Sequence, residues 1–164
     1  MELLEPQPLA DHHQIGAFDS GVELLDQWLK QRAQSNQVND ASRVVVICDG
    51  DKAAGYYALA AGAVSTTIVP GFFRRNMPDP IPVAILGRLA IDRAYQRRGI
   101  GRLMLYDAAR RIVSAAEIIG IRGMIVHAIS EEAQAFYMTY GFTPSPVEPR
   151  KLMVTLADLR RANR

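Results

Sequence analysis

Two glycines and a group of arginines in the middle of the chain have the residue types and spacing of an anion-binding site. Residues 96–101 read Gln-Arg-Arg-Gly-Ile-Gly, between an apolar run typical of a strand and a helical apolar pattern. Free amides at the start of a helix carry partial positive charge, and glycine lets an anion approach that backbone closely. The pattern therefore predicts a pyrophosphate site, with a tight turn before a helix as the alternative.

This loop differs from two common nucleotide-binding loops. It has no Gly-Lys-Ser/Thr, and it lacks the three-glycine spacing of the dinucleotide fingerprint. The charge of the chain nevertheless favours an anionic partner, because residues 74–111 contain nine arginines and three acids, whereas residues 1–30 contain six acids and one base. Arginine offers a planar fork of donors that fits phosphate. We expect a polyphosphate ligand, a nucleic acid or both, against the alternative of a solvated basic surface.

Apolar periodicity and turn residues place this loop in an α/β fold with a mixed sheet. The predicted helices cover residues 21–37, 99–120 and 131–140, with a capping box at Ser20 and Glu23 and a cap at Ser130. The predicted strands cover residues 43–48, 54–64, 83–91, 123–129 and 151–156, and the first two form a hairpin. Strand 83–91 is nearly all apolar, which indicates burial on both faces. Residues 65–82 are expected to be irregular.

Length and composition indicate one soluble globular domain over residues 1–164. The chain is 49% hydrophobic and 22% charged, as folded domains are, and it contains no apolar run long enough to cross a membrane. Its start does not resemble a signal peptide, so we expect a cytoplasmic protein. The single Cys48 excludes an internal disulfide, and His12 and His13 lack further ligands nearby, so no metal site is expected.

Two motifs together resemble the GNAT N-acetyltransferase superfamily. Gln96-x-x-Gly99-x-Gly101 after a buried strand is similar to its acetyl-CoA motif, and residues 135–142 carry a tyrosine four residues before Gly-Phe, as that superfamily does. The resemblance implies a GNAT fold, with a mixed, mostly antiparallel central sheet flanked by helices. It also implies that acetyl-CoA binds with its pyrophosphate on the loop amides and its pantetheine arm along the preceding strand. The implied cofactor-binding residues are Leu89, Ala90, Ile91, Gln96, Arg97, Arg98, Gly99, Ile100, Gly101 and Arg102.

A narrower resemblance covers roughly residues 10–160. It is carried by residues 18–29, 41–43, 86–92, 107–110, 126–128 and 141–146. These segments together are similar to the GNAT toxins of bacterial type II toxin–antitoxin modules, the TacT/AtaT-like family. That resemblance implies a toxin that acetylates the α-amine of aminoacyl-tRNA and blocks translation. It further implies a ribbon-helix-helix antitoxin, operator DNA bound through the complex, and a homodimer.

Acetyl transfer to such an amine needs little help from a base. A free α-amine titrates near pH 8, and esterification of its carboxylate lowers that value, so water can accept the proton. The departing thiolate needs a proton donor, and a tyrosine phenol is a reasonable general acid. The superfamily resemblance assigns this role to Tyr137, with Tyr140 as the competing candidate. A backbone amide of residues 89–91 is implied as the donor to the acyl oxygen.

Three arginines are candidates for tRNA contact. Arg74 and Arg75 lie in the proline-rich segment and Arg93 follows the strand, where each could equally be a solvated surface charge. Two other functions stay open at this point. An ordinary GNAT enzyme would acetylate a small-molecule or protein amine without tRNA, and a CoA-sensing or DNA-bound regulatory subunit would not need Tyr137.

Overall fold

The computed structural model describes residues 2–162, which form two compact units. Among the described residues, unit 1 comprises residues 2–60 and 87–108, and unit 2 comprises residues 61–86 and 109–162. Three long elements start in one unit and end in the other, so neither unit is a continuous stretch of chain. None of the helices in residues 2–162 combines the length and the apolar character that crossing a membrane requires.

The strands confirm the predicted mixed, mostly antiparallel sheet. Within residues 2–162, seven strands are hydrogen-bonded in the order β1-β2-β3-β4-β5-β7-β6. The strands are β1 (Gln7–Pro8), β2 (Arg43–Asp49), β3 (Lys52–Val64), β4 (Ile81–Ile91), β5 (Gly123–His127), β6 (Thr143–Pro144) and β7 (Lys151–Thr155). The pairs β1–β2, β2–β3, β5–β7 and β6–β7 are antiparallel, whereas β4 and β5 pair in parallel at Ala84, Ile85 and Leu86.

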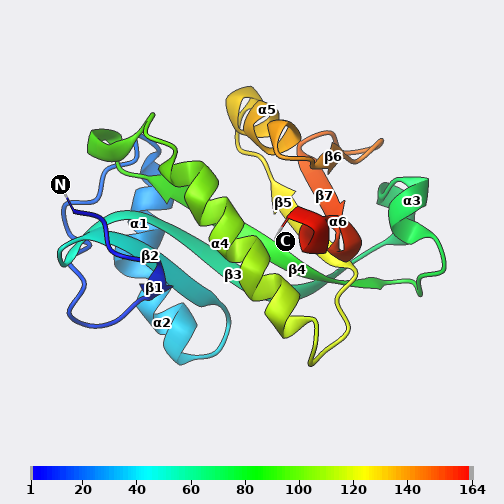
Figure 1. The fold of residues 1–164 in the computed structure, drawn as a ribbon, viewed down its shortest axis with the longest axis horizontal. Coiled ribbons are helices and arrows are strands. Elements are labelled where there is room, and N and C mark those ends of the chain that lie inside the picture. Colours follow the sequence, from blue (N-terminus) through cyan, green and yellow to red (C-terminus); the bar gives the residue numbers. More distant parts are fainter. Residues whose placement is uncertain (1, 163–164) are drawn as a thin grey trace. The chain divides into compact units, whose positions relative to one another are not determined.

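The helices differ widely in length (Figure 1). They are α1 (Glu23–Gln31), α2 (Ala33–Val38), α3 (Gly71–Arg74), α4 (Ile100–Ala115), α5 (Glu131–Thr139) and α6 (Leu156–Ala162), with 3-10 turns η1 (Thr66–Ile68) and η2 (Arg93–Tyr95). The cap predicted at Ser130 is confirmed, because its side chain accepts the Ala133 amide at 3.0 Å. The strands β1 and β6 and the helices α3 and α6 were not predicted, since each is too short to show a period.

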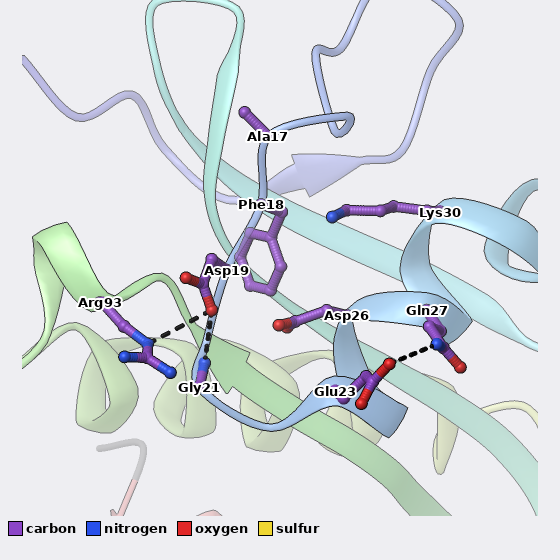
Figure 2. A pocket seen from close by; sticks show the side chains of 9 residues that line it. All are labelled: Ala17, Phe18, Asp19, Gly21, Glu23, Asp26, Gln27, Lys30 and Arg93. Carbon is purple, nitrogen blue, oxygen red and sulfur yellow. Dashed lines mark hydrogen bonds and ion pairs between the residues drawn. The ribbon is translucent and has the colours of Figure 1, made fainter.

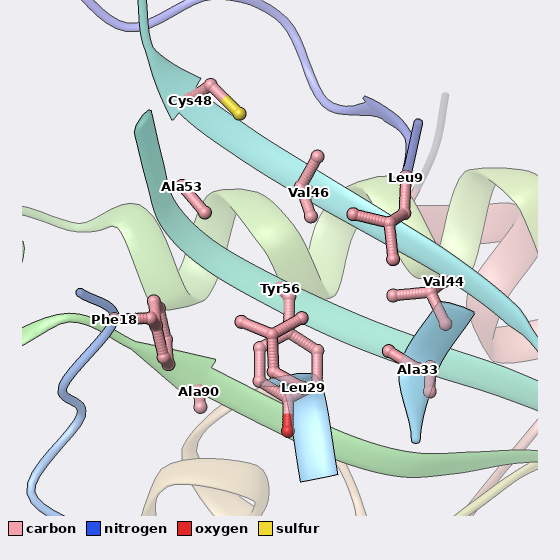
Figure 3. Packing of buried hydrophobic residues seen from close by; sticks show 11 residues of the cluster. Leu9, Phe18, Leu29, Ala33, Val44, Val46, Cys48, Ala53, Tyr56 and Ala90 are labelled. Carbon is pink, nitrogen blue, oxygen red and sulfur yellow. The ribbon is translucent and has the colours of Figure 1, made fainter. Parts of the chain in front are cut away.

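Two neighbouring tyrosines of β3 are buried on opposite faces of the sheet in unit 1. Successive strand residues point to opposite sides, and Tyr56 and Tyr57 are both fully buried. Tyr56 packs with Leu29 of α1 in the apolar cluster that Figure 3 shows. On the other face, the Tyr57 hydroxyl donates to a carboxylate oxygen of Asp107 in α4 at 2.6 Å. The strands of unit 1 therefore lie between α1 and the first part of α4.

Unit 2 has its own core, in which a glycine permits close packing. Phe73 and Met153 belong to its buried cluster. Gly123 on β5 lies against this region, and a Cβ placed there would be 2.0 Å from the Val154 carbonyl oxygen of β7 and 3.0 Å from Phe73. The close approach of β5 and β7 therefore requires glycine at this position.

We expect Gly123→Ala to destabilise the fold by about 1–3 kcal/mol or more, because the added methyl must separate two paired strands. Urea unfolding of the variant and of wild type measures this difference. Gly120→Ala is the matched control, since a Cβ at Gly120 meets no atom within 4 Å. Equal stability of the Gly123 and Gly120 variants would contradict the close-packing interpretation.

The helix predicted over residues 21–37 is wrong as a single element. It breaks at Arg32, whose φ of −124° leaves the helical region, and α2 continues from Ala33. The break is accompanied by two side-chain contacts of Gln37, which donates to the Leu9 carbonyl at 2.8 Å and accepts the Val44 amide at 2.9 Å. These contacts fix α2 to β2 and to Leu9, the residue that follows β1, and helical periodicity contains no information about them.

The predicted capping box is also wrong. Val22 is the N-cap residue of α1, and its side chain makes no capping bond. Instead the Asp26 carboxylate accepts the Ser20 amide at 3.0 and 3.1 Å and the Ser20 hydroxyl at 2.6 Å. Glu23 is bonded by Gln27 at 2.9 Å and does not reach back to Ser20. The carboxylate of Asp26, in the first turn of α1, thus bonds Ser20 in place of that of Glu23.

Two other boundaries need correction. Helix α4 ends at Ala115, before the predicted stop at Gly120, and tight turns follow, so Ile119 is 56% exposed and does not continue the buried stripe. Strand β4 is not buried along its whole length, because Leu89 and Ile91 are only half-buried. The predicted hairpin is confirmed by the register of β2 and β3.

Candidate active site

The predicted cofactor residues lie together in unit 1, along the end of β4, a loop and the start of α4. Leu89, Ala90 and Ile91 are the last residues of β4, and α4 begins at Ile100. Two residues of the loop are in the left-handed region, Arg97 with φ 64° and Gly99 with φ 77°. Left-handed residues in a turn direct successive amides to one side, which creates a concave site for an anion.

The amides at the start of α4 are available to a ligand. Within the described chain, the N–H groups of Gly99, Ile100 and Gly101 donate to no protein acceptor. A Cβ at Gly99 would meet no atom within 4 Å, so the space over this backbone is open. Open space, unpaired amides and the helix N-terminus suit a pyrophosphate, and these residues fit the phosphates of acetyl-CoA.

Gln96 fixes the loop to the protein. Its side-chain nitrogen donates to the Ile91 carbonyl and to the Ser20 carbonyl, each at 2.8 Å. One bond joins the loop to the end of β4, and the other joins it to the segment before α1. Both amide hydrogens of this side chain are therefore engaged by backbone carbonyls, so Gln96 positions the loop in which the sequence predicts an anion site.

Asp92 and Tyr95 support the same loop, although neither is among the site residues that the sequence predicts. Asp92 is buried, and its carboxylate accepts the Ala94 amide at 2.9 Å and the Asp19 amide at 3.0 Å. The Tyr95 hydroxyl donates to Asp49 at 2.7 Å, and this bond lowers the pKa of Asp49 and raises that of Tyr95. The signal available in the sequence was an aspartate directly after a buried strand.

The arginines around the loop are all exposed. Arg97 makes no hydrogen bond or ion pair within residues 2–162, and Arg98 and Arg102 lie on either side of the glycines. Three exposed guanidinium groups beside unpaired amides create a positive potential at the start of α4. The site is therefore basic as well as rich in donors, as the sequence predicts.

The three arginines suggested for tRNA contact are in different settings. Arg93 is in unit 1 and forms an ion pair with Asp19 at 3.3 Å (Figure 2). Arg74 in unit 2 donates to the Val69 carbonyl at 2.7 Å. Arg75, also in unit 2, is exposed and has no partner in the described part of the chain. Of the three, Arg75 has all its donors available.

A cavity of about 630 Å³ in unit 1 lies next to Arg93. Figure 2 shows its lining, which is Ala17, Phe18, Asp19, Gly21, Glu23, Asp26, Gln27, Lys30 and Arg93. Its carboxylates are hydrogen-bonded to Gly21, Gln27 and Ser20, so none of them is an unengaged base. Among residues 2–162, no three His, Cys, Asp or Glu side chains are grouped closely enough to hold a metal ion.

Tyr137 lies on α5 in unit 2, among aromatic rings. It is 7% exposed, and its ring contacts Phe136 and Phe142 edge-on, with centroids 5.3 and 5.5 Å away. Its hydroxyl makes no hydrogen bond with residues 2–162. Burial raises the pKa of Tyr137 to about 12. A protonated hydroxyl with no protein partner is able to donate to a ligand.

Tyr140 differs from Tyr137 in its surroundings. It is the C-cap residue of α5 and is 40% exposed, and its ring contacts Phe136 at 5.0 Å. Gly141 then takes φ 95° and ends the helix, as predicted. Burial thus distinguishes Tyr137, which matches the motif position, from the competing candidate Tyr140.

Residues 40–144 match the family profile described as an acetyltransferase (GNAT) domain. This match covers more than half of the chain and includes the strand, loop and helix of the anion site together with Tyr137. The chain belongs to the GNAT acetyltransferase family.

Relatives of this acetyltransferase include proteins that act on tRNA. The tRNA-acetylating toxin of Mycobacterium tuberculosis (strain ATCC 25618 / H37Rv) is 45% identical over 155 residues, which are 94% of this chain and 93% of that protein. AtaT complexed with acetyl-methionyl-tRNAfMet is 27% identical, with TM-score 0.90 and 98% and 99% of the two chains covered. The DNA-bound AtaT–AtaR complex is 28% identical, with TM-score 0.79 and 97% and 99% covered.

The raised pKa of Tyr137 gives this acetyltransferase an expected pH dependence. Only the protonated phenol can donate a hydrogen bond. Because the pKa of Tyr137 is about 12, the phenol stays protonated at pH values where an ordinary tyrosine, with a pKa near 10, would ionise. Up to pH 10, kcat should therefore show no loss caused by ionisation of Tyr137. Ultraviolet titration of wild type and Tyr137→Phe should assign a late-ionising phenol to this residue. A falling limb with a pKa near 10 that disappears in Tyr137→Phe would contradict this expectation.

Proposed function

We propose that this chain is the toxin of a type II toxin–antitoxin module that transfers acetyl from acetyl-CoA to the α-amine of aminoacyl-tRNA. The observation that carries this proposal is the 45% identity, over 94% of the chain, to a protein named as a tRNA-acetylating toxin. The anion site at Gly99 and the basic surface around it support the same function, because the donor and the acceptor both carry phosphates. Acetylation of the amine blocks its use in translation.

The donor is acetyl-CoA. In our proposal its pyrophosphate lies on the amides of Gly99, Ile100 and Gly101, and its pantetheine arm pairs with Leu89, Ala90 and Ile91. Arg97, Arg98 and Arg102 balance the phosphate charge. We also propose that residues 1–164 act as one acetyltransferase domain, since the family profile includes segments of both units.

The reaction joins the amine nitrogen to the acetyl carbon and breaks the carbon–sulfur bond of the thioester. The aminoacyl ester carries an amine of lowered pKa, which is largely neutral near pH 8. In our proposal the amine proton leaves through water, because an amine of lowered pKa needs no strong protein base. A backbone amide of residues 89–91 donates to the acyl oxygen as negative charge develops there.

In this mechanism Tyr137 donates a hydrogen bond to the sulfur as it departs. Because its pKa is about 12 and that of a thiol is about 8.5, complete proton transfer to sulfur from the buried phenol is unfavourable. The hydroxyl therefore stabilises the developing thiolate by a hydrogen bond. The amine loses one proton to water and the thiolate takes one proton from water, so the reaction is balanced in protons. The unpartnered hydroxyl of Tyr137 supports this role.

The further assignments concern partners and contacts. We propose a ribbon-helix-helix antitoxin that binds operator DNA together with this chain, a homodimer, and action in the cytoplasm, where charged tRNA is found. The AtaT–AtaR complex with DNA, similar over 97% of this chain, supports the antitoxin and DNA assignments. Arg75 is the best-placed of the three arginines for a tRNA phosphate, because Arg74 and Arg93 already have protein partners.

The test is acetyl transfer from labelled acetyl-CoA to a pool of charged tRNA, with deacylated tRNA and free amino acids in parallel. We expect label on charged tRNA alone, and loss of that label when the ester bond is hydrolysed. Transfer to free amines but not to tRNA would replace this proposal with that of an ordinary acetyltransferase.

A further inference from the structure

An arginine, a tryptophan and a tyrosine form a stack on the α1 side of unit 1. The Arg88 guanidinium of β4 lies 4.2 Å from the centroid of the Trp28 ring, within the range of a cation–π contact. Trp28 in turn stacks on Tyr56, with centroids 6.0 Å apart and rings 9° from parallel. Tyr56 is fully buried, and its hydroxyl donates to the Leu25 carbonyl at 2.7 Å. Figure 3 shows this ring inside the apolar cluster, so the stack has a rigid base.

The stack holds Arg88 without using its hydrogen-bond donors. Arg88 is half-buried, and within residues 2–162 it makes no hydrogen bond and no ion pair. One acid in this region is Asp26, whose charge contributes to raising the pKa of the Tyr56 hydroxyl. Its carboxylate accepts hydrogen bonds from the amide and hydroxyl of Ser20 and forms no ion pair with Arg88. A partly buried guanidinium whose N–H donors have no acceptor among residues 2–162 can offer them to an anionic ligand.

Arg88 lies next to the proposed acyl-transfer segment. It directly precedes Leu89, Ala90 and Ile91 in β4. Strand alternation puts Arg88 on the same face as Ala90, and Ala90 belongs to the cluster that contains Tyr56 and Leu29. An anion bound by Arg88 would therefore lie on the α1 face, beside the backbone proposed to hold the thioester.

We propose that Arg88, held in place by Trp28, binds the phosphodiester next to the esterified 3′-terminal nucleotide of the acceptor tRNA. This inference rests on the proposed function. A planar guanidinium fork pairs with two phosphate oxygens at once, whereas a free amino acid or a simple amine offers no phosphate. Arg88 is then a substrate-binding residue that selects a nucleotide-linked amine, and Trp28 is its positioning residue.

The test compares two acceptors that carry the same amino acid. One is an aminoacylated CCA trinucleotide, which has the phosphodiester, and the other is aminoacyl-adenosine, which lacks it. Wild type should prefer the trinucleotide in kcat/KM. Arg88→Gln should reduce that preference by about tenfold to hundredfold, chiefly through KM, because a charge-assisted bidentate contact is lost. Arg88→Lys should recover part of it, since the charge remains but the fork is lost.

Arg32→Gln is the matched control, because Arg32 is an exposed arginine at the end of α1 that is outside the stack. Trp28→Leu should raise KM for the trinucleotide, and Trp28→Phe, which keeps a π face, should recover most of the loss. Calorimetry with acetyl-CoA alone should give the wild-type affinity for every variant.

If wild type acetylates charged tRNA but Arg88→Gln keeps the full preference for the trinucleotide, this inference fails and the proposed function stands. The same holds if Arg88→Gln weakens acetyl-CoA binding as strongly as it weakens acceptor use, because Arg88 would then serve the donor. If wild type acetylates no charged tRNA or trinucleotide, both the inference and the proposed function fail.

Discussion

Tyr137→Phe should lower kcat for acetyl transfer by about a hundredfold or more and leave acetyl-CoA affinity unchanged. A hundredfold loss corresponds to about 2.7 kcal/mol of transition-state stabilisation, within the range for a positioned proton donor. The substitution removes one oxygen from a side chain that is 7% exposed, and the ring contacts with Phe136 and Phe142 are retained. The variant should therefore fold normally and bind the donor.

Single-turnover kinetics with charged tRNA, together with calorimetry of acetyl-CoA, separate the chemical step from binding. Tyr140→Phe is the matched control, on the same helix but 40% exposed, and it should retain most of the activity. If Tyr140→Phe causes the larger loss, Tyr140 and not Tyr137 is the hydrogen-bond donor to the departing sulfur.

Gly99→Asp should weaken acetyl-CoA binding by about a hundredfold or more. The new carboxylate would stand over the unpaired amides at the start of α4, where it would both occupy the anion site and repel phosphate. At φ 77° any side chain is also strained, although no protein atom within 4 Å opposes it. The loss of binding should be visible by calorimetry without enzymatic turnover.

Two variants separate charge from strain. Gly50→Asp introduces the same residue at a glycine with φ 64° and open space, in the turn between β2 and β3, and should leave acetyl-CoA affinity unchanged. Gly99→Ala adds strain without charge and should weaken binding less than Gly99→Asp. Wild-type affinity in Gly99→Asp would show that the pyrophosphate does not bind at this loop.

Much of the architecture was predictable because it depends on local patterns. The hairpin of β2 and β3 follows from two apolar, β-branched runs around an Asp-Gly turn, and the cap of α5 follows from serine before two acids. The mixed, mostly antiparallel sheet follows from the order of these elements. The left-handed turn at Gly99 before α4 was predictable because glycine adopts this conformation without strain.

Elements whose limits depend on distant contacts were not predictable. The break at Arg32 accompanies the bonds from Gln37 to Leu9 and Val44, and Ser20 is held by Asp26 rather than by Glu23. The short strands β1 and β6 exist because longer neighbours offer them hydrogen-bonding partners. No local propensity separates such segments from loops.

The sequence by itself determined that the chain has a strand, a glycine-containing loop and a helix in the order that a GNAT acetyltransferase requires, because glycine permits the left-handed turn and the open backbone that such a loop needs. The superfamily resemblance assigns the donor role to Tyr137, with Tyr140 as the competing candidate. Only the tertiary structure showed how their surroundings differ, because Tyr137 is buried and its hydroxyl has no partner among residues 2–162, whereas Tyr140 is exposed. Likewise, only packing could bring Trp28 of α1 against Arg88 of β4, sixty residues away, because burial and side-chain contact are properties of the folded chain.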